Sequence, residues 1–173
     1  IETHLGEVWS IDDILPHVHR VERGLIRVDA DEVTYPLHVI LRFELERDLI
    51  AGRLAVADIP EAWDAKMRDY LGLSTIDDPA NGPMQDVHWP SGAFGYFPSY
   101  TLGAMMAAQQ WAALARDNPT VEDDIAQGKV DAVNDWRRDR IWSQASRYPT
   151  PEILRRATGE LGADDDLAAQ AGG

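Results

Sequence analysis

Apolar residues recur at the spacing of an α-helix through most of the chain, whereas no segment alternates apolar and polar residues as a strand does. The longest such segment runs from about Glu32 to Ala51, with Asp31 in the N-cap position and Gly52 as its stop. Its apolar face is expected to comprise Val33, Leu37, Ile40, Leu41, Leu45 and Leu49. The pattern predicts an all-α fold.

Further helices are predicted by the same periodicity and by residues that favour helix ends. They comprise a short helix after Ser10, helices over residues 60–71, 98–116, 120–127 and 129–146, and one more that starts at Thr150. The inner face of the helix over residues 60–71 would carry Trp63, Met67 and Tyr70. The segment 98–116 is apolar almost all round and rich in alanine, so we expect it to be buried.

A polar stripe runs along the long helix beside its apolar face. Tyr35, His38 and Arg42 follow one another at helical spacing, and Asp31 or Glu32 precedes them by one turn. Such a stripe can form a buried hydrogen-bond network that fixes helix packing, or it can orient catalytic groups on a neighbouring element. The residue types alone favour packing.

Length and composition indicate one helical domain with a sizeable core. The chain has 173 residues, 45% of them hydrophobic, and we expect a single domain over residues 1–173. It contains no cysteine, which excludes disulfides and thiolate metal sites and suits a cytoplasmic protein. No apolar run long enough to span a membrane and no signal-peptide pattern is present. The first residue is Ile1 rather than Met, as expected of a fragment.

The chain is strongly acidic. Its formal net charge is −14 at pH 7, from 30 acidic residues against two Lys and 14 Arg. Because no basic run is present, we expect no nucleic-acid or anionic-membrane partner. The shortage of lysine and the surplus of aspartate are typical of a surface adapted to concentrated salt, although an ordinary acidic protein from a GC-rich genome would show them too.

The stretch from Gly82 to Gly103, GPMQDVHWPSGAFGYFPSYTLG, gathers chemically useful side chains in one loop. These side chains belong to Gln85, Asp86, His88, Tyr96 and Tyr100. Long irregular loops in compact domains are often binding or catalytic loops. Donors of this kind could stabilise an oxyanion. Alternatively, the aromatic side chains simply anchor the loop on the core and cap the next helix.

Histidines are the remaining candidates for a metal site. His17 and His19 form an H-x-H pair on an irregular segment, with His4 nearby. A site that combined them with His38 and His88 finds no support in their spacing, so solvated or hydrogen-bonded histidines are the simpler interpretation. The chain also lacks a phosphate-binding glycine loop and a G-x-S-x-G serine motif.

Two motifs resemble those of one peptidase family. The first, Gly82–Trp89, reads G-P-M-Q-D-V-H-W and fits G-x-x-Q-D-x-H-W. The second, Ile26–His38, fits I-R-x-x-A-D-E-x-T-Y-x-L-H. Both resemble the carboxypeptidase Taq family of zinc metallocarboxypeptidases, as do FGYFPSY with TLG and the later RRATGE. The resemblance covers roughly residues 20–160 and implies a helical zinc-peptidase fold.

The zinc-binding motif of that family is absent from the chain. An H-E-x-x-H sequence would supply two histidine ligands one turn apart, with its glutamate as general base, and none occurs here. The family's H-P-F, D-x-R-x-T and H-E-S motifs are missing too. The resemblance therefore implies the C-terminal part of a homodimeric enzyme that acts on peptides, with zinc or cobalt held upstream and no metal ligand in this chain.

The resemblance also implies roles for individual residues. By analogy with helical zinc peptidases, His88 with Tyr96 or Tyr100 would stabilise charge on the carbonyl oxygen of the scissile bond. The candidates for positioning substrate or supporting the loop are Gln85, Asp86 and Arg27. The candidates for holding these site residues in place, without contacting substrate themselves, are Asp31, Glu32, Tyr35 and His38. The alternative is a non-catalytic helical module for interaction or dimerisation.

Overall fold

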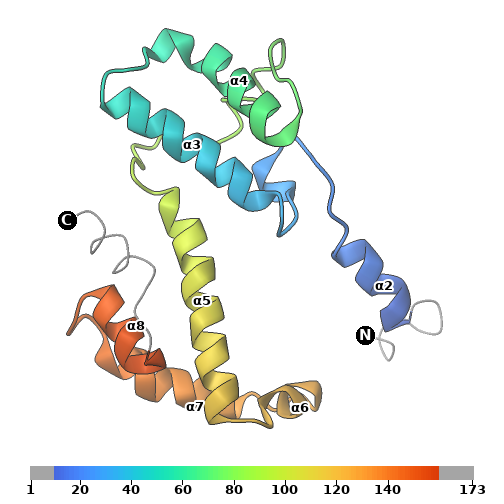
Figure 1. Cartoon of the computed structure of the whole chain (residues 1–173), viewed down its shortest axis with the longest axis vertical. Coiled ribbons are helices and arrows are strands. Elements are labelled where there is room, and N and C mark those ends of the chain that lie inside the picture. Colours follow the sequence, from blue (N-terminus) through green and yellow to red (C-terminus); the bar gives the residue numbers. More distant parts are fainter. Residues whose placement is uncertain (1–9, 160–173) are drawn as a thin grey trace. The chain divides into compact units, whose positions relative to one another are not determined.

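The computed structural model describes residues 10–159, and every regular element within them is helical (Figure 1). The α-helices are α2 (Ile11–Val18), α3 (Tyr35–Ile50), α4 (Ile59–Leu71), α5 (Pro98–Asp117), α6 (Val121–Ala126), α7 (Asp131–Arg140) and α8 (Thr150–Thr158). Short 3-10 turns occupy Arg27–Asp29 (η2), Val56–Asp58 (η3) and Trp142–Gln144 (η4). The predicted all-α class is confirmed. None of the described helices is both long and apolar enough to cross a membrane.

The chain divides into two compact units, residues 1–101 and 102–173. The boundary falls within α5, and the described part of each unit has a hydrophobic core of its own. The sequence predicts one domain over residues 1–173, and that remains a prediction. The loop with the candidate site residues lies in the first unit.

The core of the first unit forms where α3 packs against α4 (Figure 1). Helix α3 contributes Leu41 and Leu45, and α4 contributes Trp63, Met67 and Leu71, each of which is almost fully buried. Trp63 and Met67 are buried as their helical spacing predicts. The loop of residues 82–97 packs against this pair of helices through Trp89.

Helix α3 differs from its prediction at its start and on one face. It begins at Tyr35 rather than Glu32, because the Asp31 carboxylate accepts hydrogen bonds from the amides of Val33 and Thr34 and so closes a turn before the helix. Val33 is therefore outside α3, and its side chain is exposed, as is that of Ile40. Of the predicted polar stripe, His38 and Arg42 are buried, and so is Glu46 one turn further on, beside the apolar Leu41 and Leu45.

The core of the second unit joins α5, α6, α7 and α8. Its buried members are Ala113, Leu114, Val121, Trp136 and Ala157. The helix predicted over residues 129–146 is shorter, because α7 ends at Arg140 and Ala145 adopts a positive φ of 46° that an α-helix cannot continue through. A 3-10 turn occupies part of the remainder.

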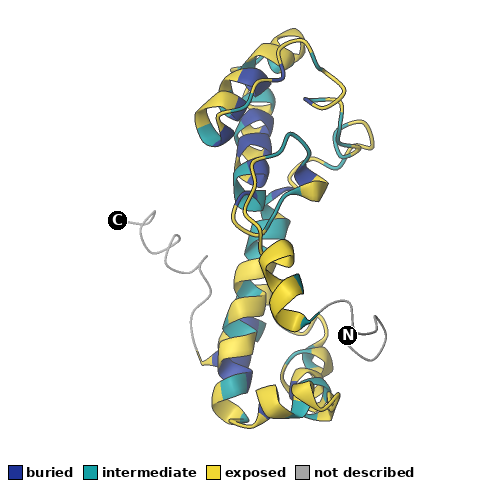
Figure 2. Cartoon of the chain, turned by 90° about the vertical axis from the view of Figure 1, so that its right-hand side faces the viewer, coloured by how far each residue is buried: buried dark blue, intermediate teal, exposed yellow. Residues whose placement is uncertain are grey.

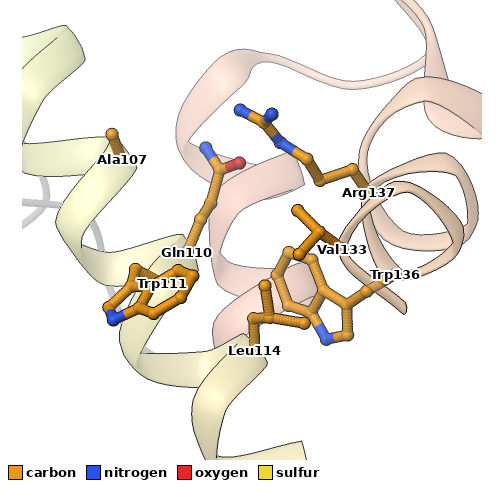
Figure 3. A pocket seen from close by; sticks show the side chains of 7 residues that line it. All are labelled: Ala107, Gln110, Trp111, Leu114, Val133, Trp136 and Arg137. Carbon is orange, nitrogen blue, oxygen red and sulfur yellow. The ribbon is translucent and has the colours of Figure 1, made fainter. Parts of the chain in front are cut away.

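Helix α5 is present as predicted, but it is not buried on all sides. Among its described residues only Ala113 and Leu114 are buried, whereas Met105 is 45% and Trp111 40% exposed. Much of this long helix accordingly has the colour of exposed residues in Figure 2. The prediction of a fully buried helix is wrong for this chain, because the described residues cover only one side of α5. A hollow of about 320 Å³ lies between α5 and α7, with Trp111 and Trp136 in its wall (Figure 3).

Candidate active site

The amide of Gln85 ties the loop to the segment that precedes α3. Its Oε1 accepts a hydrogen bond of 2.9 Å from the backbone N–H of Arg27. Its Nε2 donates to the carbonyls of Leu25, at 3.1 Å, and Asn81, at 2.6 Å. The two family-like motifs of the sequence, far apart along the chain, are thereby joined side by side.

Asp86 is the charged centre of the site. Its Oδ1 accepts hydrogen bonds of 3.1 Å from both Nε and Nη2 of Arg27, and its Oδ2 accepts one from Nε of Arg42. The side chain of Arg42 is fully buried, and those of Arg27 and Asp86 are 8% and 10% exposed. One buried carboxylate thus meets two guanidinium groups.

Burial and the Asp86 carboxylate act in opposite directions on the two arginines. Burial lowers the pKa of Arg42 to about 10, although Asp86 offsets part of the effect. Burial, the largest single cause, lowers the pKa of Arg27, but Asp86 and Tyr35 together outweigh it and the pKa of Arg27 is raised overall. Both groups therefore stay charged at neutral pH.

His88 lies between Asp86 and the aromatic side chains of the loop. Its Nε2 is 3.0 Å from the hydroxyl of Tyr100, and its Nδ1 is 3.6 Å from Oδ1 of Asp86. Its ring packs 4.6 Å from that of Phe97 and 5.5 Å from that of Tyr96, measured between centroids. His88 is thus held by aromatic packing on its faces and by polar groups at its two nitrogens.

The three tyrosines predicted for the site lie around the Arg27 guanidinium and His88. Tyr35 accepts a hydrogen bond of 2.9 Å from Nη1 of Arg27, and the Tyr100 ring lies 5.1 Å from the guanidinium carbon. Burial raises the pKa of the Tyr100 hydroxyl, which therefore stays a proton donor at neutral pH. Tyr96 is 49% exposed and contacts the Tyr100 ring edge-on at 5.3 Å.

His38 lies behind this cluster and is completely buried. Neither ring nitrogen has a hydrogen bond of good geometry to the described residues, and Nη1 of Arg42 donates to its backbone carbonyl at 2.8 Å. Burial, followed by the positive charges of Arg42 and Arg27, lowers the pKa of His38 to about 4, although the backbone of Gly24 opposes the shift. His38 is therefore neutral at pH 7.

The described partners of Asp31 and Glu32 lie in the segment that precedes α3. Asp31 accepts hydrogen bonds from the amides of Glu22, Val33 and Thr34, and these backbone donors, chiefly that of Thr34, lower its pKa to about 2. Glu32 is exposed and pairs with His19 at 3.4 Å. Both support the turn before α3, and their supporting role toward His88 remains a prediction.

Glu46 was not singled out by the sequence, and Arg42 was expected only in the polar stripe of the long helix, without Asp86 as its partner. Arg42 holds Asp86, and Glu46, one turn further along α3, accepts hydrogen bonds from the Trp89 indole and the Gly95 amide. The signal that could have found them is the repeat of His38, Arg42 and Glu46 at four-residue spacing, because this places three polar side chains on one face of the helix.

The described residues do not fit a metal ion. Between residues 10 and 159, no three His, Asp or Glu side chains lie close enough together to hold one. His17 and His19 stand on α2 and at its end, while His38 and His88 lie in the buried cluster, and His4 is outside the described residues.

Comparison with known proteins identifies the class of protein as metallopeptidase. The family model for carboxypeptidase Taq (M32) metallopeptidases matches residues 2–169. The chain belongs to this family, and the predicted membership is confirmed.

Relatives of known name show how much of such a protein the chain represents. It is 46% identical over 156 residues to thermostable carboxypeptidase 1 of Thermus thermophilus, which covers 90% of this chain and 30% of that protein. It is 39% identical over 151 residues to carboxypeptidase 1 of Bacillus subtilis, covering 87% of this chain and again 30% of the relative. The chain thus spans about a third of the length of these relatives.

Solved structures agree in fold and coverage. Metallocarboxypeptidase 1 of Trypanosoma cruzi matches with a TM-score of 0.86 and 41% identity, over 95% of this chain and 35% of that one. The M32 carboxypeptidase of Deinococcus radiodurans matches with a TM-score of 0.81 and 38% identity, over 94% and 34%. The helical fold of this chain is therefore that of one part of an M32 carboxypeptidase.

Proposed function

We propose that this chain is the C-terminal part of a zinc-dependent carboxypeptidase that releases C-terminal amino acids from peptides. The observation that carries the proposal is the contact of 3.0 Å between Nε2 of His88 and the Tyr100 hydroxyl, within a buried polar cluster. Family membership supports the reaction class, and the cluster supplies the hydrogen-bond donors that such a reaction needs.

His88 and Tyr100 act together on the carbonyl oxygen of the scissile bond. Nδ1 of His88 lies 3.6 Å from Oδ1 of Asp86 and has no hydrogen-bond partner among the described residues, so the bond that fixes the ring is the one between Nε2 and the Tyr100 hydroxyl. In the tautomer with its proton on Nε2, His88 donates to the Tyr100 oxygen, and the Tyr100 hydroxyl can then turn its own proton toward substrate. Half-exposed Tyr96 is placed to supply a second phenolic donor.

Gln85, Asp86 and Arg27 shape the place where substrate binds. Gln85 fixes the loop, and Asp86 holds both Arg27 and Arg42. The guanidinium group of Arg27, beside Tyr100, would attract an anionic group nearby, and every carboxypeptidase substrate carries a carboxylate at its C-terminus. Tyr35 and His38 support Arg27 and the helix behind it.

The metal belongs to a part of the enzyme upstream of this chain. M32 metallocarboxypeptidases require a metal, and zinc would supply a water activated for attack on the peptide bond. Because the described residues do not fit a metal, the upstream region of the same protein is this chain's first partner. A homodimer acting on peptides in the cytoplasm completes the proposal.

The proposal is tested with two forms of the protein: this chain, and the chain extended by its upstream coding sequence. Zinc titration is combined with an assay on a blocked dipeptide at high salt. We expect zinc binding and turnover only in the extended form, and His88→Ala should lower its kcat by about 10²–10³-fold, the loss typical of one oxyanion donor.

The controls separate loss of chemistry from loss of structure. His88→Ala should keep stoichiometric zinc, and His19→Ala, which removes an exposed histidine, should keep full activity. Stoichiometric zinc and turnover in the short chain would show that the active site lies elsewhere, among the histidines of this chain.

A second candidate function is non-catalytic interaction, favoured by the apolar hollow between α5 and α7 (Figure 3). Under the first proposal the upstream part of the enzyme covers this surface, whereas an interaction module would cover it with a second copy of itself. Sedimentation of the short and extended forms decides. A dimer of the short chain that Trp111→Ser dissociates would favour the second candidate.

A further inference from the structure

Glu46 is a buried carboxylate without an ion pair among residues 10–159. Only 3% of the residue is exposed, and its described partners are two N–H groups of the loop. Its Oε2 accepts a hydrogen bond of 2.7 Å from the Trp89 indole, and its Oε1 accepts one from the backbone N–H of Gly95. A buried polar side chain is costly unless it is hydrogen-bonded, and these two loop N–H groups are the described partners that satisfy Glu46.

The two groups that Glu46 holds directly flank the candidate site residues. His88 precedes Trp89 in the chain, and Tyr96 follows Gly95. Phe97, which is 1% exposed, packs against the rings of both His88 and Trp89, with centroid distances of 4.6 Å and 6.1 Å. A shift at either contact of Glu46 would therefore move a residue that faces substrate.

Packing alone does not fix the Trp89 indole. One edge of it meets Trp63 at a centroid distance of 6.5 Å, but Trp89 also lines an apolar hollow of about 340 Å³ together with Phe94. A side chain with open space beside it can rotate unless a directional bond restrains it. The hydrogen bond to Glu46 supplies that restraint.

We infer that Glu46 is a positioning residue for the proposed carboxypeptidase reaction, which holds the loop at Trp89 and Gly95 and thereby sets the places of His88 and Tyr96. The inference rests on the proposed function for its effect on catalysis. The bonds that Glu46 makes can be tested without any activity.

The decisive variants are Glu46→Gln, Trp89→Phe and the double variant. A glutamine keeps one oxygen acceptor but presents an NH₂ group to the second N–H, so one contact becomes repulsive. Trp89→Phe removes the indole donor, after which the glutamine oxygen can serve Gly95 alone. We therefore expect the fold loss of kcat in the double variant to be smaller than the product of the fold losses in the two single variants.

Activity is measured on the chain extended by its upstream coding sequence. Glu46→Gln should lower kcat by about 10–100-fold, the cost of a small misplacement of catalytic groups, with KM changed less and zinc content unchanged. Glu61→Gln, an exposed acid on α4, is the matched control and should leave kcat unchanged.

A second measurement is made on the short chain by NMR. At least one of the Trp89 indole and Gly95 amide protons should lose its hydrogen-bonded chemical shift in Glu46→Gln, while α4 amides stay unchanged. If either shift moves but kcat does not, the loop bonds exist and the positioning role is wrong. If neither moves, Glu46 does not hold the loop. If the wild-type extended form shows no turnover, the proposed function fails, and NMR still decides on the bonds.

Discussion

His38 shows how a single buried residue makes this fold sensitive to pH. It is completely buried, and its pKa of about 4 lies below its ordinary value of 6.5, mainly because burial opposes the charged form. Binding a proton at His38 is therefore easier in the unfolded chain than in the folded one. The neutral form adds stability that is full above the unfolded pKa and is lost as the pH falls toward the folded one.

We predict that the free energy of unfolding decreases by about 3 kcal/mol between pH 6.5 and pH 4 because of His38. Urea unfolding followed by tryptophan fluorescence at a series of pH values measures it. His38→Gln should remove most of this slope, whereas His19→Gln, at an exposed histidine, should preserve it. An unchanged slope in His38→Gln would assign the pH dependence to other groups.

The residues of the candidate site differ in how far the sequence could reveal them. Gln85, Asp86 and His88 stand in a compact motif, and the structure brings them together with Arg27. The pairing of Arg42 with Asp86 spans 44 positions and depends on how α3 packs, so local pattern could not give it. Glu46 escaped notice because a charged residue on a helix is ordinarily exposed.

At the scale of elements, end signals decided which boundaries were predictable. Ser10 caps α2 in a reciprocal pair with Asp13, as its position before two acids suggests. Gly72 ends α4 in the left-handed conformation that favours glycine. The start of α3 was predicted wrongly from Asp31. The side-chain hydrogen bonds that would mark a helix N-cap close a separate turn before the helix here. The exposure of α5 could not be predicted from the sequence, because apolar periodicity identifies the apolar face of a helix but not the element that packs against it.

We predict that Gly72→Ala destabilises the first unit more than Gly52→Ala. The φ angle is 68° at Gly72 and 69° at Gly52. Each alanine substitution should therefore lower the free energy of unfolding by about 1 kcal/mol through backbone strain. A Cβ at position 72 would also come within 2.7 Å of Nη1 of Arg23 and displace its bond to the Leu71 carbonyl. Gly72→Ala should therefore lower the free energy of unfolding by about 0.5–1.5 kcal/mol more than Gly52→Ala does.

Position 52 is the matched control, because a Cβ there meets no atom within 4 Å. Urea unfolding of the two variants and the wild-type chain gives both values. Equal losses at the two positions would mean that the Arg23 bond contributes nothing to stability.

At the scale of the whole molecule, charge is the dominant property. A net charge of −14 on 173 residues causes self-repulsion in dilute buffer, and salt screens that repulsion. Many ion pairs of the described residues are exposed and weak, such as that between Arg138 and Asp135. Screening should therefore relieve more repulsion than it removes attraction.

We predict that raising NaCl from about 0.1 M to about 2 M increases the midpoint of thermal unfolding. Calorimetry of the wild-type chain and of a double variant, Asp69→Asn with Asp77→Asn, measures the effect. The variant removes two exposed acids and should respond less to salt. A midpoint that falls with NaCl would show that the ion pairs outweigh the repulsion, and would argue against adaptation to concentrated salt.

The shared carboxylate of Asp86 also constrains how this protein can evolve. If Asp86 alone were replaced, Arg27 and Arg42 would be left as two uncompensated cations in a buried place. Replacement of either arginine alone costs less, because the other still neutralises the carboxylate. Viable paths of substitution should therefore pass through an arginine first, and sequences that lack the acid should also lack at least one of the two bases.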